Sequence, residues 1–161
     1  NTDILFLIYG GMEEDIRKSK KNDLPKNLIF MGYFENNKTP YLMQNMDILL
    51  MPYEKNVYLS KKTTNTAVFM SPMKMFEYMS TGVPFISTNL EVLKEILIDN
   101  YNCLLADEQN LEDWNQSILK LLKNTNFAKE LGNNAKNDLE NKYTWLKRVQ
   151  NIINFYKYNE L

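Results

Sequence analysis

The sequence predicts an α/β fold, a Rossmann-like doubly wound parallel sheet with a helical C-terminal tail. Short apolar runs such as Ile4–Tyr9 and Asp47–Met51 are typical of strands that are covered on both faces of a parallel sheet. Helix-like stretches alternate with these runs, and the C-terminal part has a helical pattern throughout. Because 161 residues with 44% hydrophobic content fit one core, we expect a single domain over residues 1–161.

The first strand is expected at Ile4–Tyr9, where β-branched and aromatic residues run without a polar interruption. Gly10 and Gly11 end it, since paired glycines are typical of a turn or of close backbone approach. Residues 12–22, MEEDIRKSKKN, then carry acidic side chains first and basic side chains last. This order matches the helix dipole and predicts a helix of about three turns.

Two more strands and another helix are expected in the next part of the chain. Asn27–Tyr33 is a second apolar run, and Asp47–Met51 is a third. Between them, Thr39 is a suitable N-cap for a helix over residues 40–45. Pro40 would then occupy the first helical position, which is the position that favours proline.

The middle of the chain combines a long polar loop with the most distinctive segment. The loop, Pro52–Met70, has many hydroxyl groups and no clear period, and such loops are often functional. Ser71 is a good N-cap, Pro72 suits the first helical position and Gly82 suits the left-handed residue after the end, which predicts a helix over residues 72–81. The remaining expected elements are a strand at Pro84–Ser87, a short helix at Glu91–Leu97, an edge strand at Asn102–Leu105 and a helical tail from Leu111 to Tyr158.

Composition argues against several classes of function. Nineteen Lys and Arg residues nearly balance 20 Asp and Glu residues, so the net charge of −1 offers no footprint for nucleic acid. With no histidine and Cys103 as the single cysteine, we expect no disulfide, no Cys/His zinc site and no histidine general base. Cys103 is expected to be an inert core residue. No carboxylate cluster suggests a metal, and no apolar run could span a bilayer, so we expect a cytoplasmic protein without metal or cofactor.

Lys74 is placed where a lysine is electrostatically unfavourable. It falls at the third position of the expected helix, where a capping box has Glu or Gln. A helix N-terminus carries roughly half a positive charge, so an exposed lysine there costs about 0.3–1 kcal/mol. A bound phosphate would reverse this sign, because the backbone N–H groups, the dipole and Lys74 would all face one anion.

Glu77 lies on the same helix face, three residues further along. Its carboxylate could accept hydrogen bonds from two hydroxyl groups, as a ribose presents them. A simpler interpretation is that Lys74 is solvated, or that it forms an ion pair with Glu77. The residues alone leave these interpretations open.

The segment Ser71–Ser87, SPMKMFEYMSTGVPFIS, resembles a motif of the C-terminal, donor-binding domain of retaining glycosyltransferases of the GT-B fold, family 4 type. The pattern SPxKxxEYMxxGxP is specific. The resemblance implies that residues 1–161 are the nucleotide-sugar-binding half of such an enzyme, without its N-terminal domain and first strand. Weaker similarities follow the family's order at residues 6–11 (FLIYGG), 27–34 (NLIFMGYF), 46–53 (MDILLMPY) and 143–156 (YTWLKRVQNIINFY).

The resemblance also implies which residues bind the donor. In the family the first turn of this helix holds the diphosphate, so Lys74 is the expected catalytic residue and Glu77 is expected to hold the ribose. Pro52 and Tyr53 resemble, more loosely, the strand end that faces the cleft. The expected donor-binding residues are Gly10, Gly11, Gly32, Tyr33, Ser71, Pro72, Met73, Lys74 and Glu77, and no metal ligand is expected.

Two departures from the family pattern are visible. Many members have a second glutamate eight positions before the residue that matches Glu77, and this chain has Phe69 there. The family's domain also normally begins with an extra strand and a basic Arg and Lys pair that grips the diphosphate, and nothing before Asn1 supplies them. We therefore expect this chain to hold part of the donor site and to be inactive alone.

The expected activity of the parent protein is transfer of a hexosyl group from a nucleotide-diphosphate sugar, with retention, to a glycan or lipid-linked acceptor. Its expected role is in cell-surface glycan, capsule or lipopolysaccharide biosynthesis, with peripheral association at the inner face of the membrane. One alternative is a sugar-nucleotide epimerase of the same fold, which usually needs further acid/base residues, often histidines. Another is a non-catalytic α/β module that binds nucleotide or a partner protein, with Phe69 reflecting lost activity.

Overall fold

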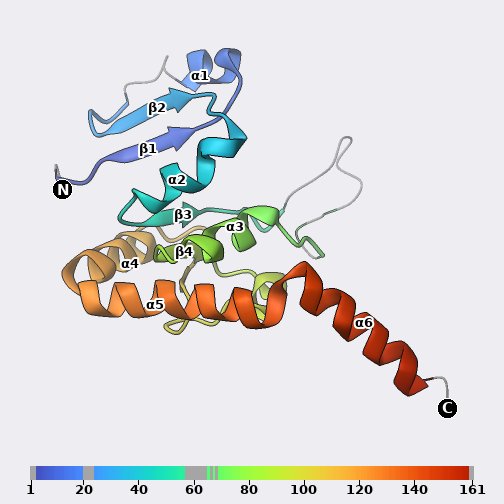
Figure 1. Cartoon of the computed structure of the whole chain (residues 1–161). Helices are drawn as coiled ribbons and strands as arrows, with labels where there is room; N and C mark the ends of the chain where they lie inside the picture. The colour runs from blue at the N-terminus through green and yellow to red at the C-terminus, as the bar shows by residue number, and fades with distance from the viewer. Residues whose placement is uncertain (1–2, 20–23, 57–64, 66, 68, 160–161) are drawn as a thin grey trace. The chain divides into compact units, whose positions relative to one another are not determined.

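The computed structural model describes residues 3–19, 24–56, 65, 67 and 69–159. The chain forms two compact units, Asn1–Leu42 and Met43–Leu161, and each is described by itself (Figure 1). The expectation of one domain over the whole chain stays a prediction. The part of the predicted loop at residues 57–64, 66 and 68, and the end of the helix predicted over residues 12–22, lie outside the described residues.

The first unit contains a parallel pair of strands, β1 (Phe6–Tyr9) and β2 (Leu28–Gly32), joined through α1 (Glu13–Ser19). Both strands were predicted, and their parallel direction is confirmed. The prediction that the first strand is covered on both faces is wrong for the described structure, because Ile8 of β1 is 41% exposed; Ile29 of β2 is exposed to the same extent. Apolar continuity identifies a strand here but does not determine how much of it is buried.

A 3₁₀ turn, η1 (Asn36–Lys38), leads directly into α2 (Thr39–Gln44). Thr39 already has helical backbone angles, φ −57° and ψ −41°, so the prediction that it is the N-cap is wrong. Its hydroxyl donates instead to the Glu35 carbonyl at 3.3 Å. A helix entered from a continuous turn has no extended residue at its start, and the threonine side chain then bonds back to the preceding turn.

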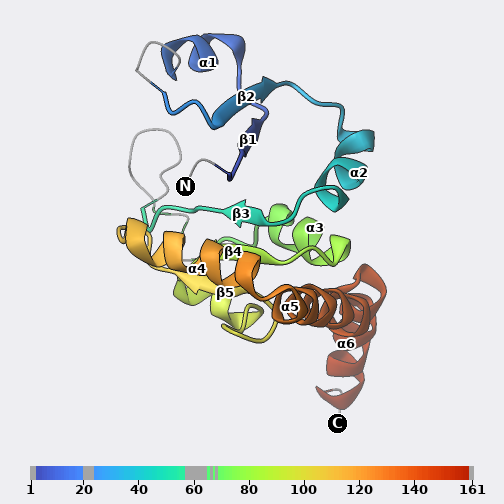
Figure 2. The same cartoon turned by 90° about the vertical axis from the view of Figure 1, so that its left-hand side faces the viewer.

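The second unit is built on a parallel sheet with the order β3 (Leu49–Met51), β4 (Phe85–Thr88) and β5 (Leu104–Ala106) (Figure 2). The central strand β4 is buried at every position. The predicted strands are therefore confirmed, including the place of β5 at an edge. The short helix predicted next is η3 (Glu91–Glu95), which is a 3₁₀ helix rather than an α-helix.

Two aspartates protect the open edge of β5. The Ala106 carbonyl accepts from Asn89 N–H on the β4 side, so the N–H groups of Leu105 and Asp107 point outward. Leu105 N–H donates to Asp99 Oδ1 at 2.9 Å, and Asp107 N–H donates to Asp113 Oδ2 at 2.7 Å. Bonded N–H groups and charged side chains at an edge strand oppose pairing with another chain.

Helices α4 (Leu111–Lys123), α5 (Thr125–Asp138) and α6 (Trp145–Asn159) form the C-terminal tail, as predicted. A π-helical turn, η4 (Leu139–Tyr143), separates the last two. Asn110 caps α4 by accepting from the N–H groups of Glu112 and Asp113, and Asn124 caps α5. Helix α6 projects beyond the end of α5 (Figure 1). It contacts η4, and its described side chains are exposed.

The core of the second unit lies between the sheet and helix α3 (Met73–Thr81). Met75 and Met79 face it from one side of α3 and are almost fully buried. Cys103 is completely buried there, as predicted, and burial raises the pKa of its thiol. Other members of this cluster include Met51, Phe85, Leu93 and Leu97.

A buried polar network joins the loop before β5 to the end of α5. The Asn102 side chain is fully buried, and its Nδ2 donates to the Ile96 carbonyl at 3.0 Å and to Asp138 Oδ2 at 3.1 Å. Its Oδ1 accepts from Ile98 N–H at 2.8 Å. Lys142 Nζ lies 2.6 Å from Asp138 Oδ1, so the buried carboxylate also has a cation beside it.

Helices α3 and α5 pack closely where two glycines meet. Gly82 ends α3 in the left-handed conformation, φ 72°, as predicted. A Cβ atom built on Gly132 would lie 2.0 Å from the Gly82 carbonyl oxygen and 3.2 Å from the Pro84 nitrogen. Only glycine at position 132 leaves room for this backbone contact.

We expect Gly132→Ala to lower the free energy of unfolding by about 1–3 kcal/mol or more, because the new methyl group must push the two backbones apart. Urea denaturation of both proteins measures this. In an unhindered helix the same change would be stabilising by about 1 kcal/mol. A gain in the free energy of unfolding would therefore contradict the close backbone contact at position 132. The exposed neighbour provides a control, since Asn133→Ala should change the free energy by no more than about 0.5 kcal/mol.

Tyr78 connects α3 to the sheet. Its hydroxyl group donates to the Leu50 carbonyl of β3 at 3.1 Å. The pKa of Tyr78 is raised from 10.0 to about 12, chiefly by burial and to a smaller extent by the nearby Tyr53 and Glu77 side chains. The folded protein therefore keeps the Tyr78 proton at pH values where the unfolded chain has lost it.

We expect the free energy of unfolding to fall between about pH 10 and pH 12, since only the unfolded chain is deprotonated at Tyr78 in that range. The stability from this group is fully present below about pH 10, and between the two pKa values its loss approaches about 1.4 kcal/mol per pH unit. Urea denaturation of the natural sequence and of Tyr78→Phe at several alkaline pH values measures the contribution of Tyr78 to this pH dependence. An equal slope in both proteins would contradict this expectation, and Tyr158→Phe, at an 81% exposed position, is the control.

Candidate functional site

The candidate site lies at the carboxyl edge of the three-stranded sheet. Because β3, β4 and β5 are parallel, their last residues meet at the same edge. Tyr53 follows β3, and its backbone N–H donates to the Thr88 hydroxyl oxygen at 2.7 Å, at the end of β4. Thr88 is completely buried, so the segment after β3 is fixed to the rigid centre of the sheet.

Helix α3 begins one residue later than predicted. Pro72 is the N-cap, with φ −72° and ψ 129°, and no side chain caps the helix there. The predictions that Ser71 is the N-cap and that Pro72 is the first helical residue are therefore wrong, and Lys74 occupies the second helical position rather than the third. Proline has a φ that suits both an extended and a helical residue, and its ψ is extended here.

As α3 starts in this way, two backbone N–H groups in its first turn have no hydrogen-bond acceptor in the described part of the chain. Met75 N–H donates to the Pro72 carbonyl at 3.1 Å. The N–H groups of Met73 and Lys74 have no acceptor among the described residues. Together with the helix dipole, two such groups make a helix end that favours a bound anion.

Lys74 is exposed, and its charge is not neutralised by a neighbour in the described part of the chain. Its Nζ lies 5.7 Å from the centroid of the Tyr53 ring, and it forms no ion pair with Glu77 or another described carboxylate. The alternative that Lys74 simply pairs with Glu77 is therefore wrong for this structure. The contact with Tyr53 was not predicted, because it joins residues that are distant in the sequence.

Glu77 is exposed on α3, close to the same tyrosine. Burial raises the pKa of Tyr53, and the negative charge of Glu77 raises it further. Since Lys74 lies over the Tyr53 ring, the structure brings Lys74 and Glu77 to the same side of the helix, as their spacing predicted. A cation and two open N–H groups thus lie at the N-terminus of α3, and a carboxylate lies one turn further along the same side of the helix.

Several side chains around the start of α3 are also exposed. Ser71 is exposed, and Met73, the first residue of the helix, is 60% exposed. Phe69, at the position of the family's first glutamate, is 63% exposed. The side chain at position 69 is thus apolar and accessible, and it supplies no acid near the start of α3.

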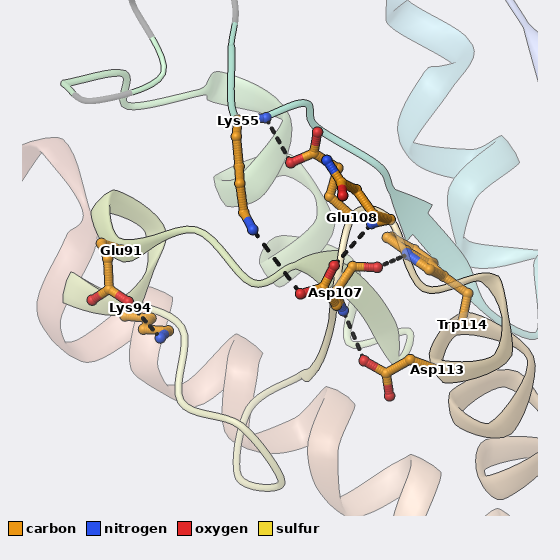
Figure 3. Close-up of polar contacts among 8 residues, drawn as sticks. Lys55, Glu91, Lys94, Asp107, Glu108, Asp113 and Trp114 are labelled. Carbon is orange, nitrogen blue, oxygen red and sulfur yellow. Dashed lines mark hydrogen bonds and ion pairs between the residues drawn. The ribbon is translucent and has the colours of Figure 1, made fainter.

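A second polar cluster ties the segment after β3 to the segment after β5 (Figure 3). Lys55 N–H donates to Glu108 Oε2 at 2.9 Å, and Lys55 Nζ lies 4.0 Å from Asp107 Oδ2. Trp114 Nε1 donates to the Asp107 carbonyl at 2.9 Å. Sequence reasoning missed this cluster, although the acidic stretch after an edge strand was a signal for it. Lys55 therefore has a carboxylate beside its ammonium group, whereas Lys74 has none among the described residues.

The predicted glycine sites lie in the first unit. Gly10 and Gly32, with φ 93° and 76°, follow β1 and end β2, and Gly10 N–H donates to the Gly32 carbonyl at 2.7 Å. Gly11 also has a positive φ of 84°, and Tyr33 is 82% exposed. A Cβ atom on Gly10 or Gly32 would meet nothing within 4 Å, so these glycines are set by backbone conformation and not by crowding. That they share one site with Lys74 stays a prediction.

The described residues contain no group of three or more Cys, Asp or Glu side chains placed to hold a metal ion. Among the helices of the described chain, none has the length and apolar character that crossing a bilayer requires.

A protein-family model described as "Glycosyl transferases group 1" matches residues 1–138. One curated relative is the uncharacterized glycosyltransferase MJ1069 of Methanocaldococcus jannaschii, which is 28% identical over 149 residues, 91% of this chain and 35% of the relative. Another is the alpha-galactosylglucosyldiacylglycerol synthase of Streptococcus pneumoniae, 26% identical over 92% of this chain and 36% of the relative. This chain thus spans about a third of the length of these relatives.

Solved structures share the fold. Anabaena Alr3699/HepE in complex with UDP-glucose superimposes with a TM-score of 0.73 at 16% identity, covering 98% of this chain and 42% of that one. The C-terminal domain of LpcC from Francisella tularensis gives a TM-score of 0.58 at 19% identity, covering 83% of this chain and 62% of that one. These likenesses confirm the predicted Rossmann-like α/β fold. With the family match over most of its length, the chain belongs to the glycosyl transferases group 1 family.

Proposed function

We propose that this chain binds a nucleotide-diphosphate sugar as the donor-binding half of a retaining hexosyltransferase of the GT-B fold, family 4 type. The observation that carries the proposal is the first turn of α3, where Lys74 forms no ion pair with a described carboxylate and the N–H groups of Met73 and Lys74 have no acceptor among the described residues. In open α/β folds, ligands bind at the carboxyl edge of the parallel strands, which is where this helix begins. A diphosphate satisfies the open donors and the cation together.

In this proposal the diphosphate lies at the N-terminus of α3. The N–H groups of Met73 and Lys74 donate to its oxygens, and the Lys74 ammonium group pairs with its charge. As the bond between sugar and diphosphate breaks, negative charge grows on the departing oxygen, and these fixed groups stabilise it. Ser71 and Pro72 line the same side. The helix end and Lys74 supply the positive charge in this mechanism, so we infer that neither a metal nor a cofactor is needed.

Glu77 is proposed to bind the nucleoside. Its exposed carboxylate, on the same side of α3 as Lys74, accepts hydrogen bonds from the two ribose hydroxyl groups. In the first unit, Gly10, Gly11 and Gly32 are proposed to allow close backbone approach to the donor. The exposed ring of Tyr33 is proposed to lie beside the base.

The comparisons support a nucleotide sugar as the ligand. Structures of the similar Anabaena protein contain UDP-glucose and UDP, and the Streptococcus pneumoniae relative is named as a synthase of a glycosylated diacylglycerol. By analogy we propose a glycan or lipid-linked acceptor and a role in cell-surface glycan, capsule or lipopolysaccharide biosynthesis. Catalysis then occurs in the cytoplasm at the inner face of the membrane, with peripheral association of the whole protein. Because this chain spans about a third of its relatives, we attribute acceptor binding and turnover to a longer protein.

One observation favours a second candidate, a non-catalytic nucleotide-binding module. Phe69 is exposed at the position where many family members have a glutamate near the donor sugar. Such a module would bind UDP or GDP as tightly as the corresponding nucleotide sugar, because it has no need to recognise the sugar. A hexosyltransferase should distinguish between nucleotide sugars.

Calorimetric titration of the chain with UDP, GDP, UDP-sugars and inorganic pyrophosphate tests the proposal. We expect one nucleotide series to bind and Lys74→Ala to weaken its binding and that of pyrophosphate about tenfold or more, because a charge-assisted contact is lost. Glu77→Ala should weaken the nucleotide by about fivefold or more and leave pyrophosphate unchanged, because only the nucleotide carries a ribose.

Lys129→Ala is the matched control, since Lys129 is an exposed lysine on α5. It should leave the dissociation constants unchanged. Absence of any nucleotide binding at millimolar concentration, or binding that Lys74→Ala leaves unaltered, contradicts the proposed function.

A further inference from the structure

Lys74 and Tyr53 form a contact that the donor-binding proposal does not use. The Lys74 ammonium nitrogen lies 5.7 Å from the centroid of the Tyr53 ring, within the range of a cation–π interaction. A free lysine side chain samples many rotamers, and binding an anion would have to restrict them. A side chain that is already held near its ligand position loses less entropy on binding.

Tyr53 is itself anchored, so its ring provides a fixed platform. Its N–H donates to the buried Thr88 hydroxyl oxygen at 2.7 Å, and the half-buried side chain packs against the core of the second unit. Lys55, two residues later, is bonded through its own N–H to Glu108. The chain around Tyr53 is therefore tied at two points to the ends of β4 and β5.

An aromatic ring holds a lysine without neutralising it. A carboxylate partner would cancel the charge of Lys74, and a diphosphate would have to displace that carboxylate. The face of a neutral ring attracts the cation through its quadrupole and leaves the positive charge available to an anion. Burial and the charge of Glu77 raise the pKa of Tyr53, so the ring stays a neutral phenol at physiological pH.

From this geometry we propose that Tyr53 is a positioning residue, whose ring face holds the Lys74 ammonium group at the N-terminus of α3 for the donor's diphosphate. The proposal rests on the proposed function and deepens it. It assigns the role to the ring, because the hydroxyl group takes no part in the contact with Lys74. It also predicts that Tyr53 acts on the diphosphate end of the donor through Lys74 alone.

The test is a double-mutant cycle read by titration with inorganic pyrophosphate and with the nucleotide that the natural sequence binds. Tyr53→Leu removes the ring and should weaken both ligands about two- to fivefold. Tyr53→Phe keeps the ring and should bind them as the natural sequence does. In the Lys74→Ala background, Tyr53→Leu should change neither dissociation constant further.

A structural role for Tyr53 predicts a different pattern. It would make Tyr53→Leu weaken binding by the same factor with Lys74 present or absent, and that result, or equal losses in Tyr53→Phe and Tyr53→Leu, overturns the proposal. If the natural sequence binds nucleotide and Tyr53→Leu changes neither dissociation constant, the role of Tyr53 is overturned and the proposed function stands. Failure of the natural sequence to bind any nucleotide overturns the proposed function instead, and with it this role.

NMR of the natural sequence tests the contact between Lys74 and Tyr53 directly, without depending on whether a Tyr53 variant folds. The ring should shift the NMR signals of the Lys74 ε-methylene protons upfield relative to those of the exposed Lys129. Lys74→Ala assigns the signal by removing it. An unshifted Lys74 signal would show that the ammonium group does not stay over the ring, and the proposal would then be wrong.

Discussion

The parallel pairing of β3, β4 and β5 is the constraint on which the site depends. Parallel strands all end at one edge, so the chain leaves the buried sheet three times at nearly the same place. Backbone groups at a buried edge need partners, and neighbouring segments supply them. Thr88 accepts from Tyr53, and Glu108 accepts from Lys55. Polar groups gather at this edge for a structural reason, and α3 begins there.

Helix α3 is firmly attached to the rest of the second unit, but no side chain of the described residues caps its N-terminus. Tyr78 bonds the helix to β3, and the contact between Gly82 and Gly132 holds its other end against α5. At the first turn, however, Pro72 has no side-chain acceptor to offer. A serine or aspartate in its place would contribute about 1 kcal/mol as an N-cap. A well-packed helix that omits so common a stabilising contact is typical of a site where a ligand supplies the acceptors.

Most of the fold could be predicted because local signals agreed with the final packing. Apolar runs identified the strands, and Gly82 ended α3 where a left-handed residue was required. The start of α3 was missed by one residue, because the φ of Pro72 is compatible with both conformations. Lys74 and Glu77 could be recognised as candidates because helical spacing is local. The contact of Lys74 with Tyr53 could not, since it depends on how β3 and α3 pack in three dimensions.

The lysines of the second unit show why the partner of a cation matters. Lys94 lies 2.8 Å from Glu91, and Lys142 lies 2.6 Å from Asp138, so each of these lysines forms an ion pair with a carboxylate of the same chain. Lys74 has an aromatic partner and keeps its charge. A group that must bind a diphosphate and later release it needs a cation that is placed but not neutralised. In the role proposed for Tyr53, the ring contact is weak enough for the anion to compete with it, and it would return Lys74 to the same place after the anion leaves.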